Sequence, residues 1–269
     1  MCWDSPDRRR RNAFWQRKPP PKSPLQQNRK SFKIASMPSS YLKVFKNIIF
    51  PSLCLCCETK IKQGHLCTGC KEKIIFLGPL LCRWCARPIS EGKISCQRCQ
   101  NKIYPYDRLI SATAYREPMV SLIHLFKYKN FDWLGQFFSS LVLEHLKNIY
   151  FNPWGYDFII PVPMHKYKLK KRGYNQSKLL AKLLSNHFKI PLRDDIINTV
   201  NIRPSQAKLQ KQKRQENVEG IFTAKKDLTN KKIILIDDIF TTGSTAASCC
   251  QTLVKQNVSS TTVITLSRS

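Results

Sequence analysis

The sequence predicts an α/β protein in which a parallel-sheet domain follows a small cysteine-rich module. Two observations support this prediction. Eight cysteines form four CxxC pairs within residues 54–99, and after Pro105 short apolar stretches alternate with helical patterns. Strands separated by helices pair in parallel and need cover on both faces. The 269 residues, 42% of them hydrophobic, suffice for such a domain and exclude a wholly disordered chain.

The chain is strongly basic. Its 46 Lys and Arg against 17 Asp and Glu give a formal net charge of +29, which predicts an anionic partner. No apolar run reaches the roughly 18 residues that a membrane span needs, so we expect no span. No secretory signal is recognised in residues 1–11, so we expect the twelve cysteines in a reducing compartment. We therefore expect a cytoplasmic location, with a peripheral position at the inner membrane as the alternative.

Residues 1–36 form a separate basic segment. Ten Lys or Arg against two Asp give it a net charge of +8, and it lacks an apolar period. This composition predicts a disordered arm. The arm is either a nucleic-acid-binding tail or sequence upstream of a start at Met37, and we favour the second interpretation. The apolar pattern over residues 41–50 then predicts a short helix packed on the next module.

Deletion of residues 1–36 should therefore leave ligand binding intact. The measurement compares the dissociation constants of the full chain and of residues 37–269 for the same ligand. A large loss of affinity on truncation would show that the arm belongs to the binding surface.

The cysteine pairs have the spacing of metal-binding ribbons. Nine residues separate the first two pairs, ten the last two, and eleven the two halves. A tetrahedral zinc ion needs four thiolates, and each CxxC turn supplies two. We predict a double zinc ribbon over residues 37–103, with interleaved pairing and a disulfide framework as alternatives. Cys56 could replace Cys57, and Cys249 and Cys250 are expected inside a helix. The predicted zinc ligands are Cys54, Cys57, Cys67 and Cys70 in one site and Cys82, Cys85, Cys96 and Cys99 in the other.

Residues 104–269 carry the helix and strand patterns of the sheet domain. Apolar residues with helical spacing occur over residues 119–126, 134–142 and 179–184. Apolar stretches typical of strands occur over residues 158–162, 233–236 and 258–266. In sheets of this kind ligands bind at the carboxyl ends of the strands, so we expect the site there.

The stretch after residues 233–236 is the most informative part of the chain. Asp237 and Asp238 precede a turn rich in hydroxyl residues around a glycine, which opens a helix. Such a turn binds phosphate through backbone N–H groups and the helix dipole. The carboxylates suit sugar hydroxyls or a magnesium ion, so the stretch predicts a sugar phosphate site. The predicted phosphate-binding residues are Thr241, Thr242, Gly243, Ser244 and Thr245.

Other interpretations of this stretch are a strand and helix N-cap without a ligand, and a receiver-type phosphoacceptor aspartate, which would not need the hydroxyl-rich turn. No GxxxxGK[ST] or GxGxxG motif is present, which argues against a nucleotide triphosphatase and a dinucleotide-binding domain.

A basic run that ends at Arg172 follows the strand at residues 158–162. Its lysines suit either a phosphate or a solvated face, whereas the planar fork of Arg172 can grip two phosphate oxygens.

These motifs together resemble the signature of type I phosphoribosyltransferases, which bind phosphoribosyl pyrophosphate (PRPP). With the cysteine pairs, residues 41–269 resemble the ComF family of competence-associated proteins. The other stretches that carry the resemblance are residues 125–128, 161–165, 172–176 and 206–207, with Arg214, Asn217, Val218, Gly220 and Phe222.

The resemblance implies a phosphoribosyltransferase-like domain over residues 104–269. Asp237 and Asp238 would hold the ribose hydroxyls of PRPP, and residues 241–245 its 5-phosphate. Arg172 and Gly173, in the loop after the strand, would lie near the pyrophosphate and its magnesium ion. If the chain is an enzyme, pyrophosphate would leave the anomeric carbon, but the sequence identifies neither a catalytic residue nor an acceptor.

The resemblance also implies a part in DNA uptake during natural transformation, with single-stranded DNA and a helicase-like competence protein as candidate partners. A non-enzymatic module that binds single-stranded DNA is the alternative function, and an adaptor assembled through its zinc sites is a third. Four tyrosines near basic residues are either stacking platforms for DNA or packing residues: Tyr104, Tyr106, Tyr167 and Tyr174.

Overall fold

The computed structural model of the chain describes residues 53–200, 221–224 and 226–269. The predicted arm over residues 1–36, the helix over residues 41–50 and the matched residues between 206 and 220 lie outside this part. The described residues belong to one compact unit. None of their helices is both long and apolar enough to cross a membrane. The domain boundary after residue 103 stays a prediction.

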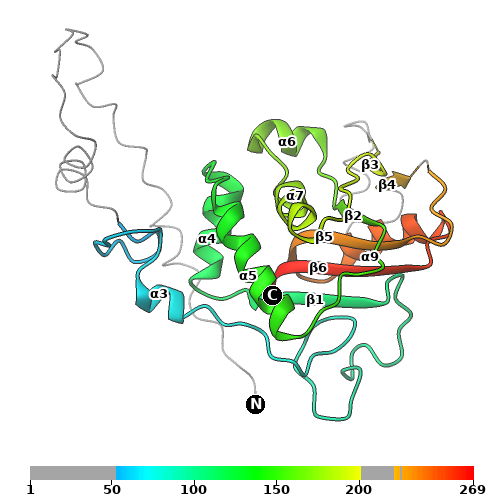
Figure 1. Cartoon of the computed structure of the whole chain (residues 1–269), viewed down its shortest axis with the longest axis horizontal. Helices are drawn as coiled ribbons and strands as arrows, with labels where there is room; N and C mark the ends of the chain where they lie inside the picture. Colours follow the sequence, from blue (N-terminus) through cyan, green and yellow to red (C-terminus); the bar gives the residue numbers. More distant parts are fainter. Residues whose placement is uncertain (1–52, 201–220, 225) are drawn as a thin grey trace, which may run out of the picture. The chain divides into compact units, whose positions relative to one another are not determined.

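A four-stranded parallel sheet forms the centre of the unit (Figure 1). Its spatial order is β1-β6-β5-β2, and every neighbouring pair is parallel. The predicted parallel α/β fold is thereby confirmed. A separate antiparallel pair joins β3 (Ile197–Thr199) and β4 (Phe222–Ala224). The sheet strands are β1 (Arg108–Ala114), β2 (Phe158–Pro161), β5 (Lys232–Phe240) and β6 (Ser260–Arg268).

Helices cover both faces of this sheet. On one face α4 (Met119–Tyr128), α5 (Leu134–Asn148) and α7 (Gln176–Phe188) pack against Ile234 and Ile236 of β5. On the other face Cys249, Cys250 and Leu253 of α9 (Ser244–Val254) pack against Ile233 and Leu235. Alternate residues of β5 thus enter two different cores, as a doubly covered strand requires.

The structure differs from the predicted elements in several places. Strands β1, β3 and β4 were not predicted, and β5 continues four residues beyond Ile236 because β6 pairs with it as far as Phe240. The basic run after β2 forms helix α6 (Lys166–Arg172) and is not a loop. The Nδ1 atom of His165 caps this helix by accepting a hydrogen bond from the Tyr167 amide, which satisfies one of the free donors of the first turn.

The cysteine-rich module packs against both cores of the sheet domain. Cys54, Leu66 and Cys70 of its first half, which contains helix α3 (Thr68–Glu72), join the core under α4 and α5. Ala86 of its second half joins the core under α9. Between the halves, residues 75–77 run along β1, where the Ala114 amide donates to Ile75 O at 2.9 Å. This segment covers an edge strand that would otherwise expose unpaired backbone groups.

Candidate functional site

The eight cysteines of the CxxC pairs converge at two points. One group contains Cys54, Cys57, Cys67 and Cys70, the other Cys82, Cys85, Cys96 and Cys99, and within each group all sulfur atoms lie within 4.8 Å of one another. The Sγ atoms of Cys57 and Cys67 are 3.5 Å apart, and those of Cys85 and Cys96 are 3.6 Å apart. A tetrahedral zinc ion with bonds of about 2.3 Å holds its sulfur ligands roughly 3.8 Å apart.

This geometry fits zinc and gives each half of the module its own site. The halves therefore do not interleave, and none of the described cysteines forms a disulfide. Cys56 lies outside both groups, and burial raises the pKa of its thiol to about 12, so it stays a neutral thiol at neutral pH. Four protein ligands leave zinc no open position for a reactant. The two zinc sites are thus structural.

Four of the seven predicted sugar phosphate residues, Asp237, Asp238, Thr241 and Thr245, line a cleft of about 460 Å³ at the carboxyl ends of β2 and β5. A cleft of this size is within the range of small-molecule sites. Asp237 and Asp238 of β5 form one wall of the cleft, just before the hydroxyl-rich loop. Residues 162–165, which follow β2, also line the cleft. Arg172, Thr241 and Thr245 complete the predicted residues that line it.

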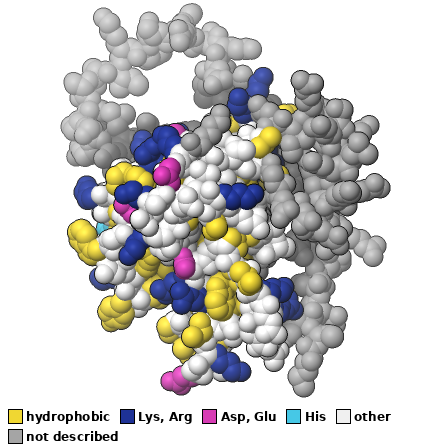
Figure 2. Space-filling model, turned by 90° about the vertical axis from the view of Figure 1, so that its right-hand side faces the viewer, with side chains coloured by type: hydrophobic (Ala, Val, Ile, Leu, Met, Phe, Trp, Pro, Cys, Tyr) yellow, Lys and Arg dark blue, Asp and Glu magenta, His cyan; other side chains and the backbone are white. Residues whose placement is uncertain are grey.

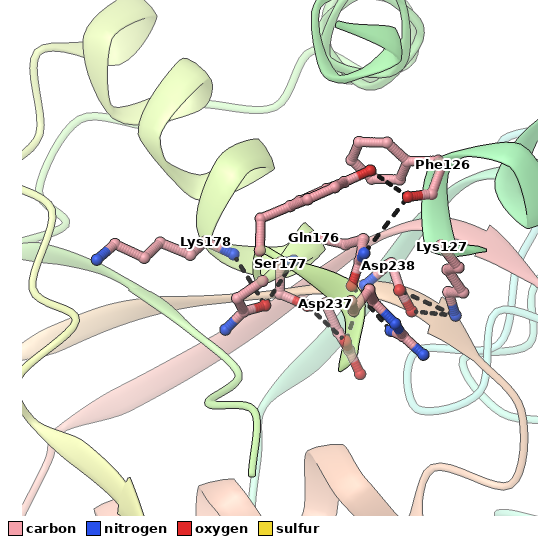
Figure 3. Close-up of polar contacts among 10 residues, drawn as sticks. Phe126, Lys127, Gln176, Ser177, Lys178, Asp237 and Asp238 are labelled. Carbon is pink, nitrogen blue, oxygen red and sulfur yellow. Dashed lines mark hydrogen bonds and ion pairs between the residues drawn. The ribbon is translucent and has the colours of Figure 1, made fainter. Parts of the chain in front are cut away.

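The two carboxylates are held in different ways (Figure 3). Lys127 of α4 donates to both oxygens of Asp238, with Nζ 2.9 Å from Oδ1 and 2.9 Å from Oδ2. Asp237 Oδ1 accepts hydrogen bonds from Ser177 Oγ at 2.9 Å and from the Asp238 amide at 2.8 Å. Burial, followed by the charge of Asp238, raises the pKa of Asp237 to about 7. Asp237 is therefore only partly ionised at neutral pH.

A network of hydrogen bonds joins the end of α4 to the start of α7. The Phe126 carbonyl accepts hydrogen bonds from Tyr174 Oη and from Gln176 Nε2 (Figure 3). Asn175 caps α7 by accepting from the Ser177 and Lys178 amides, and its Nδ2 donates to Val162 O at 3.0 Å. Residues 174–177, which include the start of α7, therefore connect the end of β2, α4 and the acidic pair.

Arg172 is the last residue of α6, and Gly173, with a φ of 86°, ends that helix. The Arg172 guanidinium lies over the Tyr128 ring, 5.0 Å from its centre, and donates one hydrogen bond to Gln176 Oε1 at 2.8 Å. Arginine has five N–H donors, so most of them remain for an anion. Among the four lysines of α6, Lys168 lines the cleft beside Arg172.

The hydroxyl-rich loop precedes α9, with Gly243 at the N-cap position. Thr242 Oγ1 lies 3.0 Å from Ser244 Oγ, and the Ser244 amide donates to Thr242 Oγ1 at 3.4 Å. Thr241 and Thr245 face the cleft, whereas Thr242, Gly243 and Ser244 are not among the residues that line it. Gly243 has a φ of 83°, and a β-carbon there would lie 2.5 Å from the Phe240 ring.

Gly243→Ala should distort this loop. A side chain disfavours the left-handed conformation by about 1–2 kcal/mol, and the clash with Phe240 should cost a further 1–3 kcal/mol or so. Denaturant unfolding and ribose 5-phosphate affinity are the measurements. Gly155→Ala is the control, because Gly155 also has a positive φ of 90° but no atom within 4 Å of the added carbon. Equal losses of stability and of affinity in the two variants would contradict a role for the close approach of Gly243 to the Phe240 ring.

Two side chains of the site were not predicted from the sequence: Lys127 and Ser177, which hold the two carboxylates. Lys127 follows the buried Phe126 in a mostly apolar helix, and a lone charge at such a position indicates a buried partner. Three of the four candidate tyrosines are packing residues. Tyr106 donates to Trp84 O, Tyr104 to Cys99 Sγ and Tyr174 to Phe126 O, whereas Tyr167 is exposed.

Residues 45–100 match the double zinc ribbon domain family. The chain is 27% identical over 223 residues to the DNA utilization protein YhgH of Escherichia coli K12, which covers 81% of this chain and 97% of that protein. It is 28% identical over 216 residues to competence protein F of Haemophilus influenzae, covering 77% and 92%. It is also 28% identical over 242 residues to competence protein ComFC of Bacillus subtilis, covering 81% and 95%.

Two solved structures are also similar. The purine phosphoribosyltransferase of Pyrococcus horikoshii is 17% identical with a TM-score of 0.33, over 51% of this chain and 84% of that chain. The adenine phosphoribosyltransferase of Leishmania donovani is 12% identical with a TM-score of 0.31, over 74% and 77%.

The sequence similarities over about four-fifths of the chain and the match to the ribbon family agree with the resemblance inferred from the motifs. The chain carries a double zinc ribbon in front of a parallel α/β domain, and it is a homologue of the ComF-type competence proteins.

Proposed function

We propose that the cleft binds PRPP or a related 5-phosphorylated pentose, and that the chain is a phosphoribosyltransferase-like protein. One observation carries the proposal. The acidic pair, two threonines of the hydroxyl-rich loop and Arg172 line the same cleft, although they come from segments more than 60 residues apart. A phosphopentose has neutral hydroxyls next to an anionic group. The carboxylates of the cleft can accept hydrogen bonds from the hydroxyls, and the threonines and Arg172 can donate to the anionic group.

The charge distribution along the cleft supports this orientation of the ligand. Asp237 and Asp238 would accept hydrogen bonds from the ribose hydroxyls. Thr241, Thr245 and the amides at the start of α9 would hold the 5-phosphate. On the other side, Lys168 and Arg172 offer positive charge to a pyrophosphate group.

The chain's own residues would act by positioning the ribose and its leaving group. Holding the ribose by its hydroxyls and its 5-phosphate fixes the anomeric carbon relative to Arg172. Positive side chains then stabilise the negative charge that grows on a departing pyrophosphate. A magnesium ion bound with the ligand would neutralise part of that charge. We propose no acceptor, because no described residue identifies one.

A role in the handling of DNA during natural transformation is the second part of the proposal. The homologues are named as DNA utilization and competence proteins. Their similarity extends over most of both chains, which favours a related role here. A reducing, cytoplasmic location agrees with zinc-binding cysteines that are not joined in disulfides in the described part of the chain.

The test of the proposed site compares ribose 5-phosphate with its two halves, ribose and inorganic phosphate, by calorimetric titration of the zinc-loaded full chain. A cleft that recognises both parts should bind ribose 5-phosphate at least roughly tenfold more tightly than either half. Equal affinity for inorganic phosphate would show a simple anion site and would contradict the proposal.

Binding of single-stranded DNA is a second candidate function, favoured by the basic surface of the second ribbon. Residues 82–102 contain five Lys or Arg and one Glu, a net of +4 before the zinc site is counted. Four thiolates and one zinc ion contribute −2, which leaves +2. A groove of about 560 Å³ on this ribbon is lined by Arg87, Lys93 and Arg98. Figure 2 shows Lys and Arg side chains spread over one face of the molecule, with fewer acidic side chains among them.

A further inference from the structure

The ion pair between Lys127 and Asp238 is unusual in being almost fully enclosed. The exposed fractions of the two side chains are 17% and 12%, and the ammonium contacts both carboxylate oxygens at 2.9 Å. Desolvation offsets most of the attraction in such a pair, so it adds little to folding stability. A purely structural explanation is therefore weak, and the position of the pair inside the cleft points to the ligand.

Lys127 and Ser177, which contact the two carboxylates, belong to helices α4 and α7, and hydrogen bonds connect these two helices. The backbone of α4 next to Lys127 is fixed by the hydrogen bonds that Tyr174 and Gln176 donate to Phe126 O. The same segment continues into Ser177, which donates to Asp237 (Figure 3). Movement of one carboxylate relative to the other would therefore break this connection.

These contacts leave few acceptor positions open. Two ionised carboxylates without partners form a typical site for a divalent cation, which prefers several oxygen ligands. Here the ammonium takes one position on each oxygen of Asp238, and two donors take Oδ1 of Asp237. The positive charge of Lys127 offsets one negative charge of the acidic pair. The remaining acceptors suit neutral hydroxyl groups better than a bare cation.

We propose that Lys127 is a specificity-determining residue, which makes the Asp237–Asp238 pair an acceptor for the two adjacent hydroxyls of a ribose instead of a divalent cation site. This inference rests on the proposed function and specifies its ligand. A divalent ion would then enter the cleft only with the phosphates of the ligand. Ribose 5-phosphate would bind more tightly than 2-deoxyribose 5-phosphate, which lacks one of the two hydroxyls.

The test replaces Lys127 by Met, which has a similar length and no charge, and by Arg, which keeps the charge. Lys129→Met is the matched control, because Lys129 is exposed on the same helix end. Two quantities are measured on zinc-loaded full chain: the affinity for Mn²⁺ in the absence of sugar, and the affinities for ribose 5-phosphate and its 2-deoxy analogue. Circular dichroism establishes that each variant is folded.

For Lys127→Met we expect Mn²⁺ to bind about tenfold more tightly or better, and ribose 5-phosphate to lose at least about tenfold in affinity. Selectivity over the 2-deoxy analogue should fall with it. Lys127→Arg and Lys129→Met should resemble the wild type in the Mn²⁺ titration. If Lys127→Met does not fold, Lys127→Gln provides the same comparison, because it also removes the charge.

The outcomes separate this inference from the proposed function. Wild-type protein that fails to bind ribose 5-phosphate at all would overturn the proposed function and the inference with it. Wild-type protein that binds ribose 5-phosphate, together with a folded Lys127→Met variant of unchanged Mn²⁺ and sugar affinities, would overturn the inference alone.

Discussion

Asp237→Asn should weaken the binding of PRPP by roughly 10- to 100-fold, the value of one hydrogen bond to a charged group. Asp237 Oδ1 is already engaged by Ser177 and by the Asp238 amide, so its Oδ2 is the atom left for a ribose hydroxyl. An asparagine that keeps the two existing bonds through its carbonyl oxygen presents an NH₂ group at this position. This NH₂ group can only donate hydrogen bonds, whereas the ribose hydroxyl needs an acceptor at this position.

The same variant separates the two candidate functions. Removing a negative charge should leave the affinity for single-stranded DNA equal or higher, because phosphate contacts dominate that affinity. Asp227→Asn is the control, since Asp227 is exposed and accepts its hydrogen bonds from the amide and the hydroxyl of Thr229. PRPP affinity that is unchanged in Asp237→Asn, or lost equally in Asp227→Asn, would contradict the role given to the pair.

The stability of Asp237→Asn provides an independent check through its pH dependence. The pKa of Asp237 is raised to about 7 in the folded chain, whereas an unfolded Asp has a pKa near 3.9. Folding is therefore favoured when the carboxyl is protonated, so the contribution of Asp237 to wild-type stability should fall as the pH rises from about 4 through 7. The neutral Asn does not titrate. The melting temperature of the variant should exceed that of the wild type at pH 8, and by less at pH 5.

Removal of zinc should unfold the ribbon module and expose both cores of the sheet domain. Cys54, Leu66 and Cys70 are buried together with the apolar face of α4, and Ala86 is buried under α9. Structural zinc sites contribute on the order of 10 kcal/mol of apparent binding energy, much of it as folding energy. A strong chelator should therefore lower the melting temperature sharply, and metal analysis before treatment should give two zinc ions per chain.

Adjacent cysteines offer a matched pair of variants for this prediction. Cys57 belongs to the first sulfur group and Cys56 does not. Cys57→Ser should reduce the zinc content from two ions to one and destabilise the chain, whereas Cys56→Ser should keep both ions. Less than one zinc ion per chain in the wild type, or equal zinc content in the two variants, would contradict the assignment.

The sequence predicts most of the fold because its strongest patterns are local. Four CxxC pairs define the ribbons, and the run from Ile233 to Ile236 is buried on both sides as its composition suggests. Strand β1 carries Ser111 and Thr113 among its apolar residues, so its pattern is weaker. The length of β5 depends on hydrogen bonds with β6, which no pattern within β5 indicates.

The candidate site is only partly predictable for the same reason. Asp237, Asp238 and the loop that follows are contiguous in the sequence, and their chemistry can be inferred from that stretch alone. Lys127 lies 111 residues before Asp238, and Ser177 lies 60 residues before Asp237. Only the packing of α4 and α7 on the same face of the sheet brings these partners together.

Titration of PRPP with magnesium into the zinc-loaded full chain tests the central claim most directly. If the acidic pair and the hydroxyl-rich loop recognise a phosphorylated pentose, calorimetry should give a saturable heat with one ligand per chain, which competing ribose 5-phosphate diminishes. An absence of saturable heat at millimolar PRPP, with two zinc ions bound and the chain folded, would contradict the claim.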